Sequence, residues 1–160
     1  MKPFPFSNNN RNVPLILSIF TLALFRLFLI NSPLERDEGE YAYMAARFLD
    51  GEAPFASAYN MKLPGVALIY AGFQSVFGNT IEAVHLALFV FDLLTLILMH
   101  LLLQQAKIGT TLSSYTLFFL ALLLPGWHTL GFASHATHFV LTCTLAGLLF
   151  TLKAINNRSL

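Results

Sequence analysis

Most of the charged side chains of this sequence lie in one segment, residues 33–65, and their types suit acid–base and phosphate chemistry. The segment carries six of the eight acidic residues and three of the nine basic residues of the chain. Asp37 and Glu38 form an acidic pair near its start, and Lys62 stands near its end. A carboxylate can take the proton from an attacking hydroxyl group, and a lysine can neutralise the charge that develops on a departing phosphate. Together these residues indicate group transfer from a phosphate-linked lipid.

Each of these residues also has a purely structural interpretation. Asp37, with Glu40 three residues later, is typical of a capping box at the start of a helix. Acidic residues are favourable there because of the helix dipole. Lys62 precedes an apolar segment, where a lysine can extend its amine from the membrane surface to water. The pattern leaves both interpretations open.

The remainder of the sequence predicts an all-α integral membrane protein that positions this segment. The chain is 56% hydrophobic and only 11% charged, with 16 phenylalanines, which is too little polar surface for a soluble domain. Runs of about 20 apolar residues can cross a bilayer. We expect a single membrane domain, residues 1–160, with four spanning helices at about 13–30, 83–103, 110–127 and 132–152. No small-residue cleavage site follows the first run, so we interpret it as a retained helix.

The loop between the first two spans, residues 31–82, should contain two surface helices. Tyr41, Met44, Ala45 and Phe48 form one apolar stripe, which predicts an amphipathic helix at about 38–50, ended by Gly51. We expect it to lie on the outer membrane surface with this apolar face down. Residues 63–77 are apolar but too few to span easily, so they predict an interfacial or re-entrant helix.

Basic residues in short loops predict the orientation. They lie before the first span, between the second and third, and after the fourth, at Lys2, Arg11, Lys107, Lys153 and Arg158. This distribution places both termini in the cytosol and the charged loop outside. A net charge of +1 without a basic patch argues against nucleic-acid binding.

Two motifs of the outer loop resemble a known family. The stretches "RDEGEYAYMAARFLDGEAPF" and "NMKLPGVALIYAGFQSVFG" are similar to the first outer loop of the GT-C class of polytopic glycosyltransferases. This superfamily uses polyprenyl-phosphate-linked sugars and includes the protein O-mannosyltransferases and the lipid A aminoarabinose transferases. The matching positions are the acids Asp37 and Glu38, the helix end Gly51 to Phe55, Lys62 to Pro64, and Phe77-Gly78. Leu63 replaces the first proline of the family's Lys-Pro-Pro.

The resemblance implies specific roles for these residues. Asp37 would be the catalytic base, Lys62 would bind the donor phosphate, and Glu38 would be a supporting acid that binds a sugar hydroxyl or a divalent cation. It implies hexosyl or pentosyl transfer with inversion, on the outer side of a bacterial inner membrane, to a lipopolysaccharide, another glycolipid or a protein. No firm cofactor and no metal ligand set follow from it. Family members are much longer, so we expect this chain to be an N-terminal portion.

Several polar residues outside the acidic pair should surround the site. We expect a cavity lined by Glu40, Tyr41, Tyr59, His85, His135 and His138. His128, His135 and His138 would share a stripe on a continuous helix, but Gly131 predicts a break after His128. Metal binding, interfacial packing and cavity lining all remain open for these histidines.

Two charged residues fall within the predicted spans. Asp92 lies near the middle of the second span, where an ion is usually paired, with Arg26 or His100 as its partner. We expect Arg26 itself to extend toward the outer interface. If Arg26, Asp92 and the histidines were the working groups, the chain would be a small non-catalytic membrane protein, such as a transporter subunit or an assembly partner.

Overall fold

The described part of the chain, residues 12–53, 55–56 and 61–158 of a computed structural model, is helical and contains no β-strand. Its α-helices are α1 (Val13–Leu29), α2 (Arg36–Leu49), α3 (Gly65–Phe77), α4 (Ile81–Gln105), α5 (Thr110–Leu123) and α6 (Ala136–Arg158), with a short 3₁₀ helix, η2 (Trp127–Thr129), before α6. The all-α class predicted from the apolar runs is confirmed.

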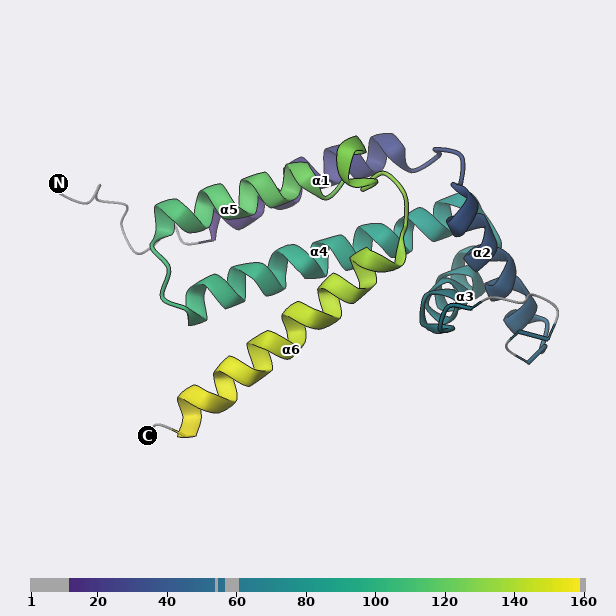
Figure 1. The fold of residues 1–160 in the computed structure, drawn as a ribbon. Helices are drawn as coiled ribbons and strands as arrows, with labels where there is room; N and C mark the ends of the chain where they lie inside the picture. Colours follow the sequence, from purple (N-terminus) through teal and green to yellow (C-terminus); the bar gives the residue numbers. More distant parts are fainter. Residues whose placement is uncertain (1–11, 54, 57–60, 159–160) are drawn as a thin grey trace.

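The four longest apolar helices run beside one another, and α2 and α3 gather at one end of them (Figure 1). Helix α1 packs along α5, and α4 lies between this pair and α6. Helices α4 and α6 both start at the end next to α2 and α3 and both run away from it. The acid-rich segment that contains α2 and α3 therefore lies at one end of the bundle, and α1 begins at the other end.

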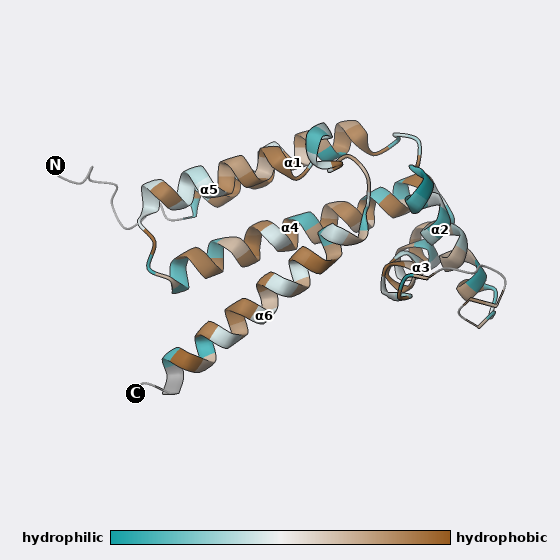
Figure 2. Ribbon diagram, in the orientation of Figure 1, coloured by the Kyte–Doolittle hydropathy of each residue, from teal (hydrophilic) through white to brown (hydrophobic). Residues whose placement is uncertain are grey.

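Two helices, α4 and the segment Ala136–Asn156 of α6, are long and apolar enough to span a membrane. Helices α1, α3 and α5 are apolar but shorter. Figure 2 shows hydrophobic residues along the long helices and hydrophilic residues concentrated on α2. Many large apolar side chains of α1 point outward, including Phe28, which is 87% exposed. The helices thus bury only part of their apolar surface against one another.

The connection from α5 to α6 corrects two of the predicted spans. The third was expected over 110–127 and the fourth over 132–152, but α5 ends at Leu123 and α6 begins at Ala136. Pro125 favours this end because it cannot continue the hydrogen bonding of the helix. Leu130 then adopts a left-handed conformation with φ 53°. Gly131 packs directly on the end of α5, where a Cβ atom would lie 1.9 Å from the Leu124 carbonyl oxygen.

Helix α2 packs through its apolar stripe, but against a neighbouring helix. Tyr41, Met44 and Ala45 are buried and contact Val66 and Tyr70 of α3. The predicted stripe is confirmed. The expectation that this face lies on the membrane is wrong, because α3 covers it.

A buried charged cluster joins α1, α4 and α6. The Arg26 guanidinium donates to Asp92 Oδ2, with Nε at 2.8 Å, and to the Gly131 carbonyl oxygen at 2.7 Å. His138 Nδ1 lies 2.9 Å from Asp92 Oδ1. Arg26 was one of two predicted partners for Asp92; the other, His100, instead pairs with Gln104. The expectation that Arg26 extends to the interface is wrong, because its side chain is 3% exposed and fully engaged inside the bundle.

Candidate functional site

The first turn of α2 presents Asp37, and a reciprocal capping box fixes that turn. The Glu35 side chain accepts from the Asp37 N–H at 2.8 Å, and the Glu38 side chain accepts from the Glu35 N–H at 2.8 Å. The box therefore uses Glu35 and Glu38, two residues earlier than the predicted pair of Asp37 and Glu40. In this register the Asp37 carboxylate takes no part in the capping box. It lies at a helix N-terminus, where negative charge is favourable.

Lys62, just before α3, meets Asp37 across the loop. Its Nζ lies 2.6 Å from Asp37 Oδ2, 3.9 Å from Glu40 Oε2 and 5.0 Å from the centre of the Tyr41 ring. Lys62 holds the pKa of Asp37 below its ordinary value, and Asp37 raises the pKa of Lys62. The Asp37 side chain is 21% exposed and that of Lys62 is 42% exposed. These contacts hold the two side chains in place, and both remain accessible to a ligand.

A cavity of about 920 Å³ opens next to this pair. Asp37, Lys62, Thr129 and His135 contribute polar groups to its lining, and most of its wall is apolar. The apolar wall comes from α2, α3 and α6 and includes Tyr41, Leu63, Val66, Ile69, Phe139, Val140 and Cys143. A compartment lined by an ion pair and a mostly apolar wall fits an amphiphile with an anionic head.

Glu38 occupies a different environment from its neighbour Asp37. Its side chain is 1% exposed, and its carboxylate accepts from the backbone N–H groups of Glu35 and Ser134. Burial opposes ionisation of Glu38, but His85 and these two N–H donors outweigh it and lower its pKa. Both carboxylate oxygens are already engaged. The surroundings therefore do not support the expected role for Glu38 in binding a sugar hydroxyl or a cation.

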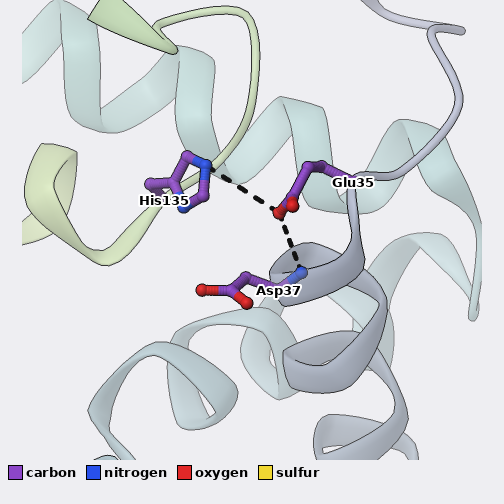
Figure 3. Close-up of side chains that lie close together, drawn as sticks. All are labelled: Glu35, Asp37 and His135. Atoms are coloured by element: carbon purple, nitrogen blue, oxygen red, sulfur yellow. Dashed lines mark hydrogen bonds and ion pairs between the residues drawn. The ribbon is translucent and has the colours of Figure 1, made fainter.

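Glu35, Asp37 and His135 form a group that the sequence did not indicate. Figure 3 shows His135, from the connection before α6, directed toward Glu35 at the start of α2. His135 Nε2 lies 3.8 Å from Glu35 Oε2, and one potential ligand atom of each residue lies within 4.8 Å of the others. Two carboxylates and an imidazole could hold a divalent cation. The only local feature of this group is the spacing of its two acids, Glu35-x-Asp37. No local feature places His135 beside them.

The other predicted cavity residues divide into two groups. Tyr41 and His135 line the cavity, and Glu40 lies beside Lys62. His85 and His138 do not line it, because His85 bonds to the Ile30 carbonyl oxygen and His138 bonds to Asp92. Tyr59 lies outside the described residues.

The three predicted histidines do not share one helical stripe. His128 belongs to η2 and His135 precedes α6, whereas His138 lies in the first turn of α6. The predicted break near Gly131 is confirmed. Among the described residues, no group of potential metal ligands contains more than one of these histidines.

Comparison with known proteins identifies no relative of this chain. No protein-family model matches the sequence, and neither a curated protein nor a solved structure is detectably similar.

Proposed function

We propose that this chain forms part of a membrane glycosyltransferase that takes a sugar from a polyprenyl-phosphate donor. The observation that carries the proposal is the Asp37–Lys62 pair in the lining of a largely apolar cavity. The donor has matching parts: an anionic phosphate, a polar sugar and a long apolar chain. The resemblance of residues 36–78 to the first outer loop of the GT-C class leads to the same reaction.

Each part of the site has a role in the proposed reaction. Lys62 binds the donor phosphate as a compact positive charge, and the apolar wall formed by α3 and α6 holds the first isoprene units. The acceptor hydroxyl oxygen attacks the anomeric carbon, the bond from that carbon to the phosphate oxygen breaks, and the polyprenyl phosphate departs. Asp37 receives the hydroxyl proton. A single displacement of this kind inverts the anomeric configuration.

Donor binding also prepares the base. In the unliganded pair, Lys62 lowers the pKa of Asp37 and makes it a weak proton acceptor. A phosphate that draws the ammonium away relieves this effect and raises the proton affinity of Asp37. The carboxylate thus becomes a better base when the donor is in place.

The proposed protein crosses the membrane four times. Helices α4 and α6 can span, and they run in the same direction, so the chain between them must cross back through α5. Helix α1, which packs along α5, would be the fourth span. At about 1.5 Å per residue, α5 is shorter than the apolar core of a bilayer, which local thinning can accommodate. We place α2 and α3 on the outer side and both termini in the cytosol.

The alternative function, that of a transporter subunit or an assembly partner, would depend on the buried cluster of Arg26, Asp92 and His138. A working ion site in a bundle needs a ligand atom or proton acceptor that is free to change partners. Asp92 accepts from Arg26 at one oxygen and faces His138 at the other, and Arg26 also bonds to two backbone carbonyl oxygens. These contacts favour a structural role.

The test is donor-lipid binding to the chain in nanodiscs, with a short-chain polyprenyl phosphate as the probe. Lys62→Ala should weaken binding about tenfold or more, because a charged hydrogen bond is worth roughly 1.5–3 kcal/mol. Lys62→Arg should retain part of the affinity. Lys107→Ala is the matched control, because Lys107 is an exposed lysine in the α4–α5 connection. Equal affinity of Lys62→Ala and wild type would reject the proposal.

A further inference from the structure

His85, near the start of α4, connects three segments at the inner side of the candidate site. Its Nδ1 lies 2.8 Å from the carbonyl oxygen of Ile30, just after α1. Its Nε2 faces Glu38 Oε1 of α2 at 3.4 Å. The two side chains are buried, with 5% of His85 and 1% of Glu38 exposed. Water cannot readily replace either contact.

The bonding partners determine the protonation of His85. A carbonyl oxygen only accepts hydrogen bonds, so Nδ1 must carry a proton and donate it to Ile30. The Glu38 oxygens accept from the backbone N–H groups of Glu35 and Ser134, as a carboxylate does. A neutral His85 would then turn the lone pair of Nε2 toward a buried carboxylate, which is unfavourable. A second proton on Nε2 converts this repulsion into an ion pair.

We propose that His85, as an imidazolium, is a positioning residue that fixes Asp37 through Glu38, and that loss of its proton at raised pH loosens the donor site. Glu38 directly follows Asp37 and closes the capping box on Glu35. It also anchors the connection before α6 through the N–H of Ser134, whose carbonyl oxygen accepts from the Tyr70 hydroxyl at 2.6 Å. Releasing Glu38 therefore frees both the first turn of α2 and the segment that carries His135.

The charged groups around His85 act in opposite directions. Burial and the positive charge of Arg26 of α1 oppose the imidazolium, whereas the Glu38 carboxylate of α2, 3.4 Å from Nε2, favours it. Arg26 is held away by its bonds to Asp92 of α4 and to the Gly131 carbonyl oxygen. Two further titratable side chains of the neighbouring helices have their own partners: Tyr70 of α3 bonds to Ser134, and His138 of α6 pairs with Asp92. Glu38 is thus the acid that directly balances His85.

The first test needs no ligand and uses the chain labelled with ¹⁵N-histidine in nanodiscs. The His85 signals, assigned by their absence in His85→Gln, should report an imidazolium at pH 7 and show the loss of its proton when the pH is raised. The protection factors of the Glu35 and Ser134 backbone amides, which correct for the base catalysis of exchange, should fall over the same pH range. A neutral His85 at pH 7, or exchange that does not follow its titration, would overturn the proposal even if the variants fail to fold.

The second test rests on the proposed function and measures affinity for a short-chain polyprenyl phosphate between pH 7.5 and 9, where the probe keeps its charge. Wild type should lose about tenfold or more in affinity, because deprotonation leaves a buried carboxylate unpaired. The exposed-histidine control His128→Gln should behave like wild type. His85→Gln should bind weakly with no such pH dependence. His85→Gln combined with Glu38→Gln should regain part of the affinity, because no unbalanced carboxylate remains at this position, although the amide that replaces the Glu38 carboxylate can accept only one of the two N–H bonds. A wild-type pH profile in folded His85→Gln would overturn the proposal.

The two tests separate this inference from the proposed function. An imidazolium signal with matching amide exchange, but no lipid binding at any pH, would uphold the link between His85 and α2 and reject the glycosyltransferase proposal. Lipid binding that depends on Lys62 but not on the protonation of His85 would give the opposite result.

Discussion

Asp37 and Glu38 are neighbours in the sequence, yet the fold gives them opposite environments. Asp37 faces a cavity and Lys62, whereas Glu38 is turned inward to His85 and two backbone N–H groups. Successive helical residues point about 100° apart, so one acid can be structural while the next stays available. At the scale of single residues, this division makes Asp37 the acid with access to a substrate.

Replacing Asp37 by Asn tests its role as the base. Turnover, measured as release of polyprenyl phosphate from a labelled donor in membranes that supply acceptors, should fall by about 10²–10⁴-fold. Helix α2 should persist, because the capping box uses Glu35 and Glu38. Asp50→Asn is the matched control, because Asp50 pairs with Arg47 at the other end of α2. Wild-type turnover in Asp37→Asn at equal amounts of folded protein would exclude Asp37 as the base.

The pH dependence of the same reaction tests whether Lys62 moves from Asp37 to the donor. The ion pair holds the pKa of Asp37 below its ordinary value of 3.8. The pair therefore stabilises the fold above about pH 4, the unfolded-state pKa, and this contribution disappears as the pH falls through the lowered folded-state pKa. Activity should likewise be lost on the acidic side. The acidic limb of kcat should lie at higher pH than that of kcat/KM, because bound donor relieves the effect of Lys62. Coincident limbs would contradict this coupling.

From the sequence, Asp37 and Lys62 were expected to act in one site, but the helix cap was placed at the wrong residues. Two registers, Glu35 with Glu38 and Asp37 with Glu40, both fit the spacing of a capping box. Local pattern cannot choose between them. The choice depends on Ser134 and His85, which contact Glu38 from distant parts of the chain. The same limit applies to His135, whose contact with Glu35 requires the whole bundle.

At the scale of elements, the long helices followed from apolar runs and a break near Gly131 was predicted, but the length of the connection between α5 and α6 was not. Residues on both sides of this break are apolar, so composition suggested spans over 110–127 and 132–152. The break arises from backbone geometry: Gly131 donates to the Gly126 carbonyl oxygen at 2.9 Å and packs against Leu124. Arg26 then binds the carbonyl oxygens of Leu124 and Gly131. A hydropathy pattern does not reveal contacts of this kind.

Substituting Gly131 tests this element directly. Gly131→Ala should destabilise the fold by about 3 kcal/mol, because its Cβ would collide with the Leu124 backbone and no flexible side chain can yield. Gly147→Ala is the control: nothing lies within 4 Å of its Cβ position inside α6, and alanine favours a helix by about 1 kcal/mol over glycine. Thermal unfolding in detergent would compare the two. Equal stability of Gly131→Ala and wild type would show that the connection repacks.

At the scale of the whole molecule, charge is separated along the bundle. Helix α2, which carries several acids, lies at one end of the bundle (Figure 1). Lys107 lies just after the end of α4 and Lys153 lies near the end of α6, and both of these helices end at the far side of the bundle. Basic residues are retained on the cytosolic side of membranes. The proposed topology therefore places the Asp37–Lys62 site outside, where a lipid-linked sugar donor and its acceptor can meet away from the cytosol.

Single-cysteine labelling tests this orientation in intact cells. In a Cys143→Ala background, Ala53→Cys near the end of α2 should react with a membrane-impermeant maleimide, and Ala154→Cys near the end of α6 should react only after the membrane is opened. Both positions are exposed in the fold, so the membrane alone should separate their reactivities. Trp127→Cys reports on α5: its side chain is 73% exposed, and it should label from outside if α5 crosses the bilayer. Labelling of Ala154→Cys from outside would invert the proposed topology. Protection of Trp127→Cys until the membrane is opened, with Ala53→Cys labelled, would mean that α5 does not return to the outer side and that four spans is the wrong number.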